Sequence, residues 1–342
     1  MYVKFKWSVK EYKDAFEMME LFIKTYSERI GFDKDNPQNY VNVAGANRSS
    51  GSSEESKTAY YLSRLYSKKA EWLIKVQQDA AYLAQRAREK AKWRSSNAAC
   101  LNHVAYKSSS SKRRGRRAVA ARIGTGLSNR KTQLPASANS SIASSDSEDQ
   151  INPDIEFLSK KQGNHIGESI LESYRAATIL DDKWYKAWHS LALRHYFESE
   201  KYENQSKVTS AVIERYVVPA IHGFSRAIRL FKEDTTLQDT LRLLTVWFNY
   251  SQYDSVVRAV IEGIESIPFH TWLHVIPQIL ARIHIKSEGT SRLIKQLLAE
   301  LGKRYPHAIM FSLFVAQRSD NLDRSKAARE VLADMFVLYP EL

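Results

Sequence analysis

His270 and His274 lie four residues apart, a spacing that places two histidines on one face of a helix, where both can bind one metal ion. A metal site needs at least a third ligand, and the His-Glu-x-x-His pattern that adds a general base does not occur. We therefore expect no metal site. We interpret His270 as a residue at a helix start and His274 as a partly buried polar side chain.

Motifs for phosphoryl or acyl transfer are also missing from the sequence. It contains no Walker-type phosphate-binding loop, no His-Arg-Asp or Asp-Phe-Gly triplet and no Gly-x-Ser-x-Gly elbow. The short stretch Gly124-Thr125-Gly126 lies in a low-complexity tract and fits a flexible linker. We therefore expect no catalytic residue in this chain.

The net charge of +13 is concentrated in one segment, residues 86–131, which holds fourteen Lys and Arg and one acid, Glu89. Its densest part is a cluster of five basic residues: Lys112, Arg113, Arg114, Arg116 and Arg117. A solvated charge run in a spacer explains the cluster, and a nuclear localisation signal is the alternative. Nucleic-acid binding is not favoured, because no aromatic residues are interleaved with the charges to stack on bases.

Aromatic and basic residues gather in a predicted helix that starts near residue 183. Trp184 and Trp188 share one face of this helix, which indicates packing between helices. Lys183, Lys186 and Arg194 lie on or near the same helix. They can meet an anionic ligand or form a solvated face, and the residue types alone leave both interpretations open.

The composition predicts a helical protein with a real core. Hydrophobic residues make up 43% of the 342 residues, while 12 Gly and 8 Pro are few for an all-β protein with many tight turns. A single cysteine, Cys100, excludes a disulfide framework and indicates a reducing compartment. No apolar run reaches the roughly 18 residues of a membrane span, so we expect a soluble intracellular protein.

Periodic apolar residues divide the chain into five parts. Residues 1–31 read as a helix, 32–56 as a loop and 57–94 as a helical hairpin, and 166–342 as consecutive helical repeats. Residues 95–163 are rich in Ser, Ala, Arg and Asn with few large apolar residues, so we expect a disordered insertion there.

Short connections join the helices expected in the last part of the chain. Their predicted ranges are 167–179, 183–200, 205–231, 236–249, 253–266, 270–285, 288–304, 306–318 and 323–338. Helices of this length with short loops form antiparallel hairpins that stack side by side. The sequence therefore predicts an all-α solenoid of stacked helical hairpins, similar to TPR and HEAT repeats.

Three stretches of this part resemble the FAT region of target of rapamycin (TOR) kinases: residues 184–189 (Trp-Tyr-Lys-Ala-Trp-His), 237–248 and 271–283. The family usually has Asp and Gln where His270 and His274 stand. Around Trp7 and Trp72 the resemblance is looser, and residues 80–163 form an insertion relative to the family. The resemblance covers roughly 1–31, 57–79 and 166–338, and implies a chain ending before the rapamycin-binding domain.

The resemblance implies a scaffold without catalytic activity, whose partners are the kinase domain and the subunits of a TOR complex, in the cytoplasm or at endomembranes. It also implies an inositol hexakisphosphate pocket, for which the matching basic residues are Lys4, Lys10, Lys183 and Lys186. Solvated surface lysines are the alternative. Two other hypotheses stay open: a kinase whose catalytic half lies downstream, and an independent helical-repeat adaptor that reaches the nucleus through its basic cluster.

Overall fold

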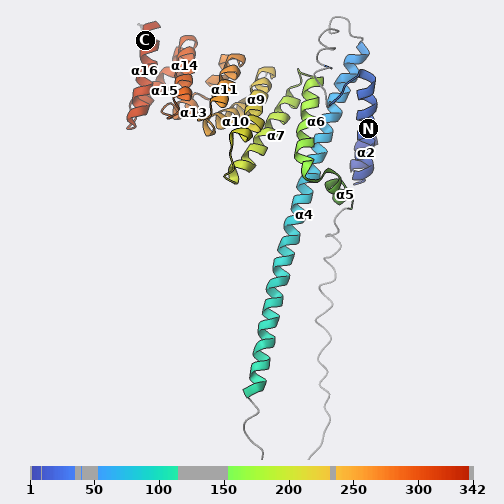
Figure 1. The fold of residues 1–342 in the computed structure, drawn as a ribbon. Coiled ribbons are helices and arrows are strands. Elements are labelled where there is room, and N and C mark those ends of the chain that lie inside the picture. The colour runs from blue at the N-terminus through green and yellow to red at the C-terminus, as the bar shows by residue number, and fades with distance from the viewer. Residues whose placement is uncertain are drawn as a thin grey trace, which may run out of the picture. The chain divides into compact units, whose positions relative to one another are not determined.

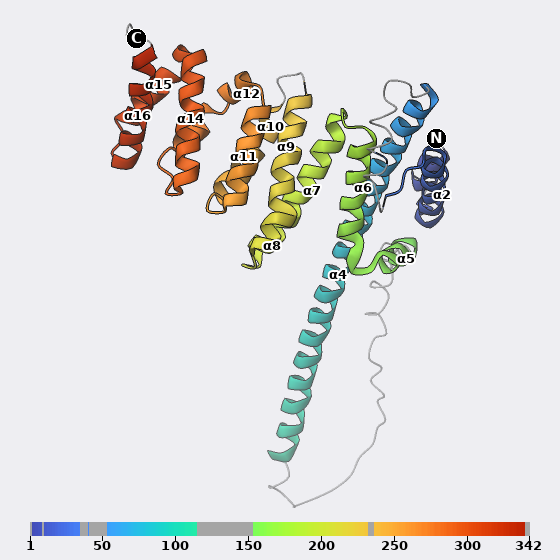
Figure 2. The same ribbon diagram turned by 45° about the horizontal axis from the view of Figure 1, so that its top comes forward.

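The computed structural model describes residues 2–8, 10–34, 40, 53–114, 153–231 and 236–338. Every regular element in these residues is a helix, which confirms the predicted all-α class (Figures 1 and 2). The helices of the first half are α1 (Tyr2–Ser8), α2 (Tyr12–Ile30), α4 (Ser53–Arg114), α5 (Pro153–Gln162) and α6 (Ile166–Leu180), with a 3₁₀ turn at Gly163–His165. None of the described helices is long and apolar enough to cross a membrane.

The second half continues as a series of short helices. They are α7 (Tyr185–Asn204), α8 (Ser210–Val212), a π-helical turn (Ile213–Val217), α9 (Val218–Leu230), α10 (Leu237–Asn249), α11 (Asp254–Ser266), α12 (Phe269–Leu273), α13 (Ile276–Ala281), α14 (Glu288–Arg304), α15 (Pro306–Gln317) and α16 (Leu322–Leu338). The range expected as one helix at 270–285 is two short helices, because Pro277 lacks the backbone N–H that a continuous helix would bond to the carbonyl oxygen of Leu273.

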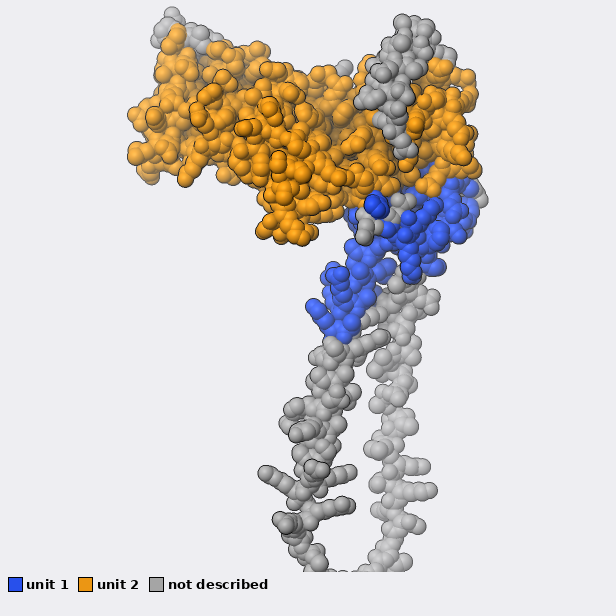
Figure 3. Space-filling view, viewed as in Figure 1, with its two compact units in different colours: residues 1–19, 71–166 blue, residues 20–70, 167–342 orange. Residues whose placement is uncertain are grey.

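The chain divides into two compact units, which Figure 3 colours separately. Unit 1 comprises residues 1–19 and 71–166, and unit 2 comprises residues 20–70 and 167–342. In unit 1 the indoles of Trp7 and Trp72 stack with their centroids 4.0 Å apart, and Tyr12 meets Trp7 edge-on at 4.7 Å. Stacked aromatic rings contribute beyond the area they bury, so this cluster forms the centre of unit 1.

Unit 2 contains a stack of helices from α6 to α16, in which helices near one another in sequence pack together, such as α7 with α9, α9 with α10 and α11, and α15 with α16 (Figure 2). Amphipathic patterns explain this packing, because buried residues recur three and four positions apart along the helices. Trp247 and Trp272 are fully buried in its core, as expected for residues that pack between helices. The predicted solenoid is confirmed.

Helices α7 and α9 approach each other closely in unit 2. A Cβ atom added to Gly223 would lie 2.8 Å from Cβ of Ala192 and 3.2 Å from its Cα. Neither atom belongs to a flexible side chain, so a larger residue at 223 would force the helices apart. Glycine at this position therefore sets the distance between the two helices.

A π-helical turn interrupts the helical stretch that leads into α9. The backbone N–H of Val218 donates to the carbonyl oxygen of Ile213, five residues earlier. Pro219 follows directly and lacks an N–H, and its ring would clash with the preceding turn of a regular α-helix. We attribute the wider turn to this proline, since π turns accommodate such irregularities within helices.

Left-handed residues end three helices. Lys10 (φ 67°), Gly31 (φ 65°) and Ser206 (φ 53°) each follow a helix and form the paired backbone hydrogen bonds of a Schellman motif. Gly31 ends α2 where the sequence predicted, but Lys10 separates α1 from α2 within the range predicted as one helix. Left-handed lysine is uncommon, so residue type gave no signal for this break.

Helix α4 differs most from the sequence prediction. It begins at Ser53, inside the expected loop 32–56, and continues to Arg114, well past the expected end at 94. Residues 80–94 are rich in Ala, Arg and Lys, and adding residues to an existing helix has no nucleation cost. Within the expected insertion α5 also forms, and its Leu158 is buried. Residues 115–152 lie outside the described residues.

Candidate functional site

The turn between α6 and α7 carries the aromatic and basic residues singled out in the sequence. Helix α6 ends at Leu180 and α7 begins at Tyr185, and Trp184 gives no side-chain hydrogen bond to the first turn of α7. Instead, Nε1 of Trp188 donates to the carbonyl oxygen of Asp182 at 2.9 Å. This indole holds the turn against the start of α7.

A buried carboxylate connects α7 to α10. Asp239 of α10 is 1% exposed, and the hydroxyl of Tyr185 donates to its Oδ2 at 2.9 Å. Nδ1 of His189 lies 2.9 Å from both carboxylate oxygens of Asp239. Nη1 of Arg242 donates to Oδ1 of Asp239 at 3.2 Å. We call these four residues the Asp239 network. A buried charge without such donors would cost several kcal/mol, so the network is what makes Asp239 tolerable in the core.

The Asp239 network shifts the pKa values of Asp239 and Tyr185. Burial alone would raise the pKa of Asp239, but the hydrogen bond and charge of His189, together with Tyr185 and Arg242, hold this pKa below its ordinary value. Burial and the charge of Asp239 raise the pKa of Tyr185 far above its usual range. The carboxylate therefore stays charged and the phenol stays a hydrogen-bond donor near neutral pH.

Arg64 of α4 covers the other side of the turn, within unit 2. Its guanidinium lies 3.4 Å from the centroid of the Trp184 ring and 4.1 Å from that of Tyr60. It also forms an ion pair with Asp181 at 3.0 Å. A planar guanidinium can stack on rings and pair with a carboxylate at once, which an ammonium cannot do in the same way.

Two exposed lysines remain on the surface of this turn. The acids of the turn are both paired with arginines, Asp181 with Arg64 at 3.0 Å and Asp182 with Arg226 at 3.5 Å. Lys183 and Lys186 are exposed beside the start of a 20-residue helix. Helix starts and lysines both favour anions, so the turn is suited chemically to bind an anionic group.

The four lysines predicted for an inositol phosphate site fall into two pairs. Lys4 and Lys10 lie in unit 1 and are exposed, with Lys10 at the left-handed end of α1. Lys183 and Lys186 lie in unit 2, close together at the α6–α7 turn. The grouping of all four into one pocket stays a prediction.

The other residues singled out in the sequence are distributed as follows. Lys112, Arg113 and Arg114 are the last residues of α4, while Arg116 and Arg117 lie outside the described residues. His270 is exposed at the start of α12, and His274, expected to be partly buried, is exposed as well. Within the described ranges no group of three or more His, Cys, Asp or Glu could hold a metal ion.

Sequence reasoning assigned no role to Asp239 or Arg64, although both are central to the site. A signal for Asp239 exists, because it continues the apolar stripe of α10 that contains Leu243 and Val246. An acid on such a stripe must be paired when it is buried. No comparable pattern marks Arg64, since its partners Asp181 and Trp184 are more than a hundred residues away in the sequence.

Two family models match this chain in its second half. The FAT domain matches residues 155–245, and the HEAT repeats of serine/threonine-protein kinase ATR-like proteins match residues 255–337. These ranges cover α5 to α10 and α11 to α16. The resemblance noted in the sequence is confirmed at this level: residues 155–245 are similar to the FAT domain, and residues 255–337 are similar to helical repeats of ATR-like kinases.

Curated relatives include several TOR kinases. The chain is 40% identical to the serine/threonine-protein kinase tor1 of Schizosaccharomyces pombe over 168 residues, which cover 48% of this chain and 7% of the relative. It is 38% identical to the serine/threonine-protein kinase mTor of Drosophila melanogaster over 186 residues, covering 49% and 8%. The chain thus spans less than a tenth of the length of these relatives, consistent with a fragment of the FAT region of a TOR kinase.

The Asp239 network predicts a pH-dependent loss of stability. Asp239→Asn removes the charge and should lower the free energy of unfolding by about 1–3 kcal/mol at pH 7. The reason is that Tyr185, His189 and Arg242 lose a charged acceptor with two oxygens. The pKa of Asp239 is lower in the folded chain than its ordinary value, so its contribution is complete above about pH 4 and disappears as the pH falls through the folded value.

Urea unfolding at pH 7, 5 and 3 measures this effect. The difference between the original chain and Asp239→Asn should shrink at pH 3, while Asp320→Asn, at an exposed loop position, should match the original chain at every pH. A difference that stays constant from pH 7 to pH 3 would contradict the assignment of a charged Asp239.

Proposed function

We propose that this chain is a scaffold segment of a TOR-type serine/threonine protein kinase, which supports the kinase domain and partner subunits and does not itself transfer phosphate. The FAT-type match and the similarity to TOR kinases support the family context. Stacked helices suit this role, because each repeat is positioned by its neighbours and the stack holds attached parts at fixed positions. We also propose the cytoplasm as its location.

The observation that carries this proposal is the second apolar face of α15. One face of the helix buries Ile309, Leu313 and Ala316 in unit 2. The opposite face presents Phe311, 77% exposed, and Val315, 55% exposed. A helix that is apolar on both sides is suited to be covered on both sides.

This exposed face extends onto α16. The rings of Phe314 and Phe336 lie 6.4 Å apart, and Val337 beside them is 82% exposed. We propose that the kinase portion of a TOR-type protein covers this surface of α15 and α16. Burying several large apolar side chains supplies about 1.5–3 kcal/mol each, enough for stable docking.

A segment exchange tests the scaffold role. Residues 166–338 of this chain replace the aligned segment of the Schizosaccharomyces pombe TOR kinase, and phosphorylation of a peptide substrate is measured on the purified chimera. We expect activity within about threefold of the parent, because the repeats keep the same helical neighbours, whereas Phe311→Asp with Val315→Asp should reduce it about tenfold or more.

Leu237→Asp is the matched control, since Leu237 is an exposed apolar residue on a different helix. It should leave the activity of the chimera unchanged. A folded chimera without activity, or a chimera indifferent to the charges at 311 and 315, would reject the scaffold proposal.

A second proposal concerns the α6–α7 turn. We propose that Lys183 and Lys186 contribute to an inositol hexakisphosphate site. Support comes from the exposure of both lysines and from the uncapped start of α7 beside them. Lysines that converge on clustered phosphates form strong charge-assisted hydrogen bonds.

Titration calorimetry of the full chain with inositol hexakisphosphate tests this site. Lys183→Ala with Lys186→Ala should weaken binding about tenfold or more. Lys326→Ala, on the exposed surface of α16, serves as the control and should change little. Absence of saturable heat with the original chain would reject the site.

A further inference from the structure

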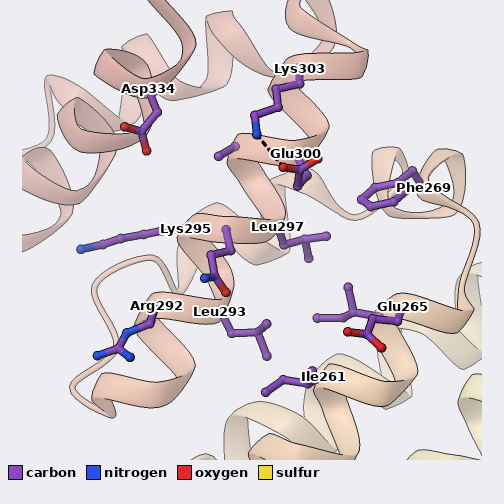
Figure 4. A pocket seen from close by; sticks show the side chains of 13 residues that line it. Ile261, Glu265, Phe269, Arg292, Leu293, Lys295, Leu297, Glu300, Lys303 and Asp334 are labelled. Carbon is purple, nitrogen blue, oxygen red and sulfur yellow. Dashed lines mark hydrogen bonds and ion pairs between the residues drawn. The ribbon is translucent and has the colours of Figure 1, made fainter. Parts of the chain in front are cut away.

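A groove of about 710 Å³ lies between α11 and α14, with α12 and α16 at its borders (Figure 4). The two helices touch near their starts, where a Cβ on Gly289 would lie 3.6 Å from Cγ1 of Val257. Further along, Arg304 of α14 lies 4.1 Å from the ring centroid of Phe269, just beyond the end of α11. Both helices therefore run in the same direction. The groove lies between residues 261–265 of α11 and residues 292–303 of α14, beyond the contact of Val257 with Gly289.

The floor of this α11–α14 groove is apolar. Ile264, Leu293 and Leu297 are buried beneath it, and Ile261 on α11 is 38% exposed. Phe269 closes one end, with one ring face covered by Arg304. Exposed apolar surface in a concave site provides the main contribution to binding another apolar group.

The cations that line the groove are already paired within the chain. Lys295 pairs with Glu330, Lys303 with Glu300 at 2.7 Å and Arg292 with Glu288 at 3.1 Å.

Two acids on the rim of the groove, unlike these cations, have no ion-pair partner in the described residues. Glu265 on α11 and Asp334 on α16 are exposed, and neither side chain makes an ion pair or hydrogen bond with any part of the chain that the structure describes. The charge that the groove offers to a ligand is therefore negative.

We propose that the α11–α14 groove binds a basic amphipathic helix of a partner protein, independently of the proposed scaffold role. Its apolar face packs on Ile261 and the partly exposed Phe269, and its Lys or Arg side chains meet Glu265 and Asp334. A helical ligand is favoured over an extended one, because a surface made of helices offers no strand edge to pair with an extended backbone. An acidic segment is disfavoured, since it would be repelled at the rim.

The acidic rim and the apolar floor of the groove should affect different rate constants of binding. Charges at an exposed rim act mainly on the association rate and its salt dependence, whereas apolar contacts act mainly on dissociation. Reversing both rim acids should therefore weaken binding of a basic helix and reduce its sensitivity to salt. Placing a charge on the floor should weaken binding at every salt concentration.

Fluorescence anisotropy with the full chain tests the proposal. The probes are a fluorescein-labelled amphipathic helix of Leu and Lys, about 18 residues long, and the same peptide with Glu in place of Lys. The groove variants are Glu265→Lys with Asp334→Lys, and Ile261→Asp. Matched controls outside the groove are Asp320→Lys, an exposed acid, and Leu237→Asp, an exposed apolar residue.

We expect saturable binding of the Lys peptide, weakened about tenfold or more by each groove variant and less than about twofold by each control. The Glu peptide should bind at least about tenfold more weakly. Hydrogen exchange on the complex should slow in residues 261–269 and 293–303. The proposal is overturned if the Lys peptide does not bind saturably, if the groove variants bind it as the original chain does, or if the controls weaken binding equally.

Discussion

Helix α9 can lie against α7 at the observed distance only because position 223 has no side chain. A methyl group there would lie 2.8 Å from Cβ of Ala192, which cannot move without moving the α7 backbone. The π-helical turn before Pro219 lets the chain enter α9 without breaking the helix. These features set where α9 lies, and α10 and α11 in turn pack against α9.

The Asp239 network adds a polar connection across the same helices. Asp239 draws the start of α7 toward α10 through Tyr185 and His189, while Arg64 and Arg226 neutralise the two acids of the preceding turn. Pairing all of these groups keeps the turn ordered. Lys183 and Lys186 lie on the exposed surface of this turn.

Much of this fold was readable from the sequence. Apolar residues three and four positions apart predicted the helices of unit 2, and Tyr305-Pro306 marked the start of α15 correctly. The ends of helices at Lys10 and Ser206 were not predictable, because neither residue type favours a left-handed conformation and tertiary contacts decide it. The site was missed: the sequence analysis did not use the position of Asp239 on an apolar stripe, and Arg64 meets Trp184 only once the chain is folded.

Native-state hydrogen exchange tests most directly whether α7, α9 and α10 form one cooperative body. Exchange of their slowest amides is followed in the original chain and in Gly223→Ala, at increasing concentrations of denaturant below unfolding. The account predicts one shared opening free energy for the three helices, lowered to the same extent in all three by the added methyl group. Amides of α10 that open independently and are unaffected by the substitution at Gly223 would contradict it.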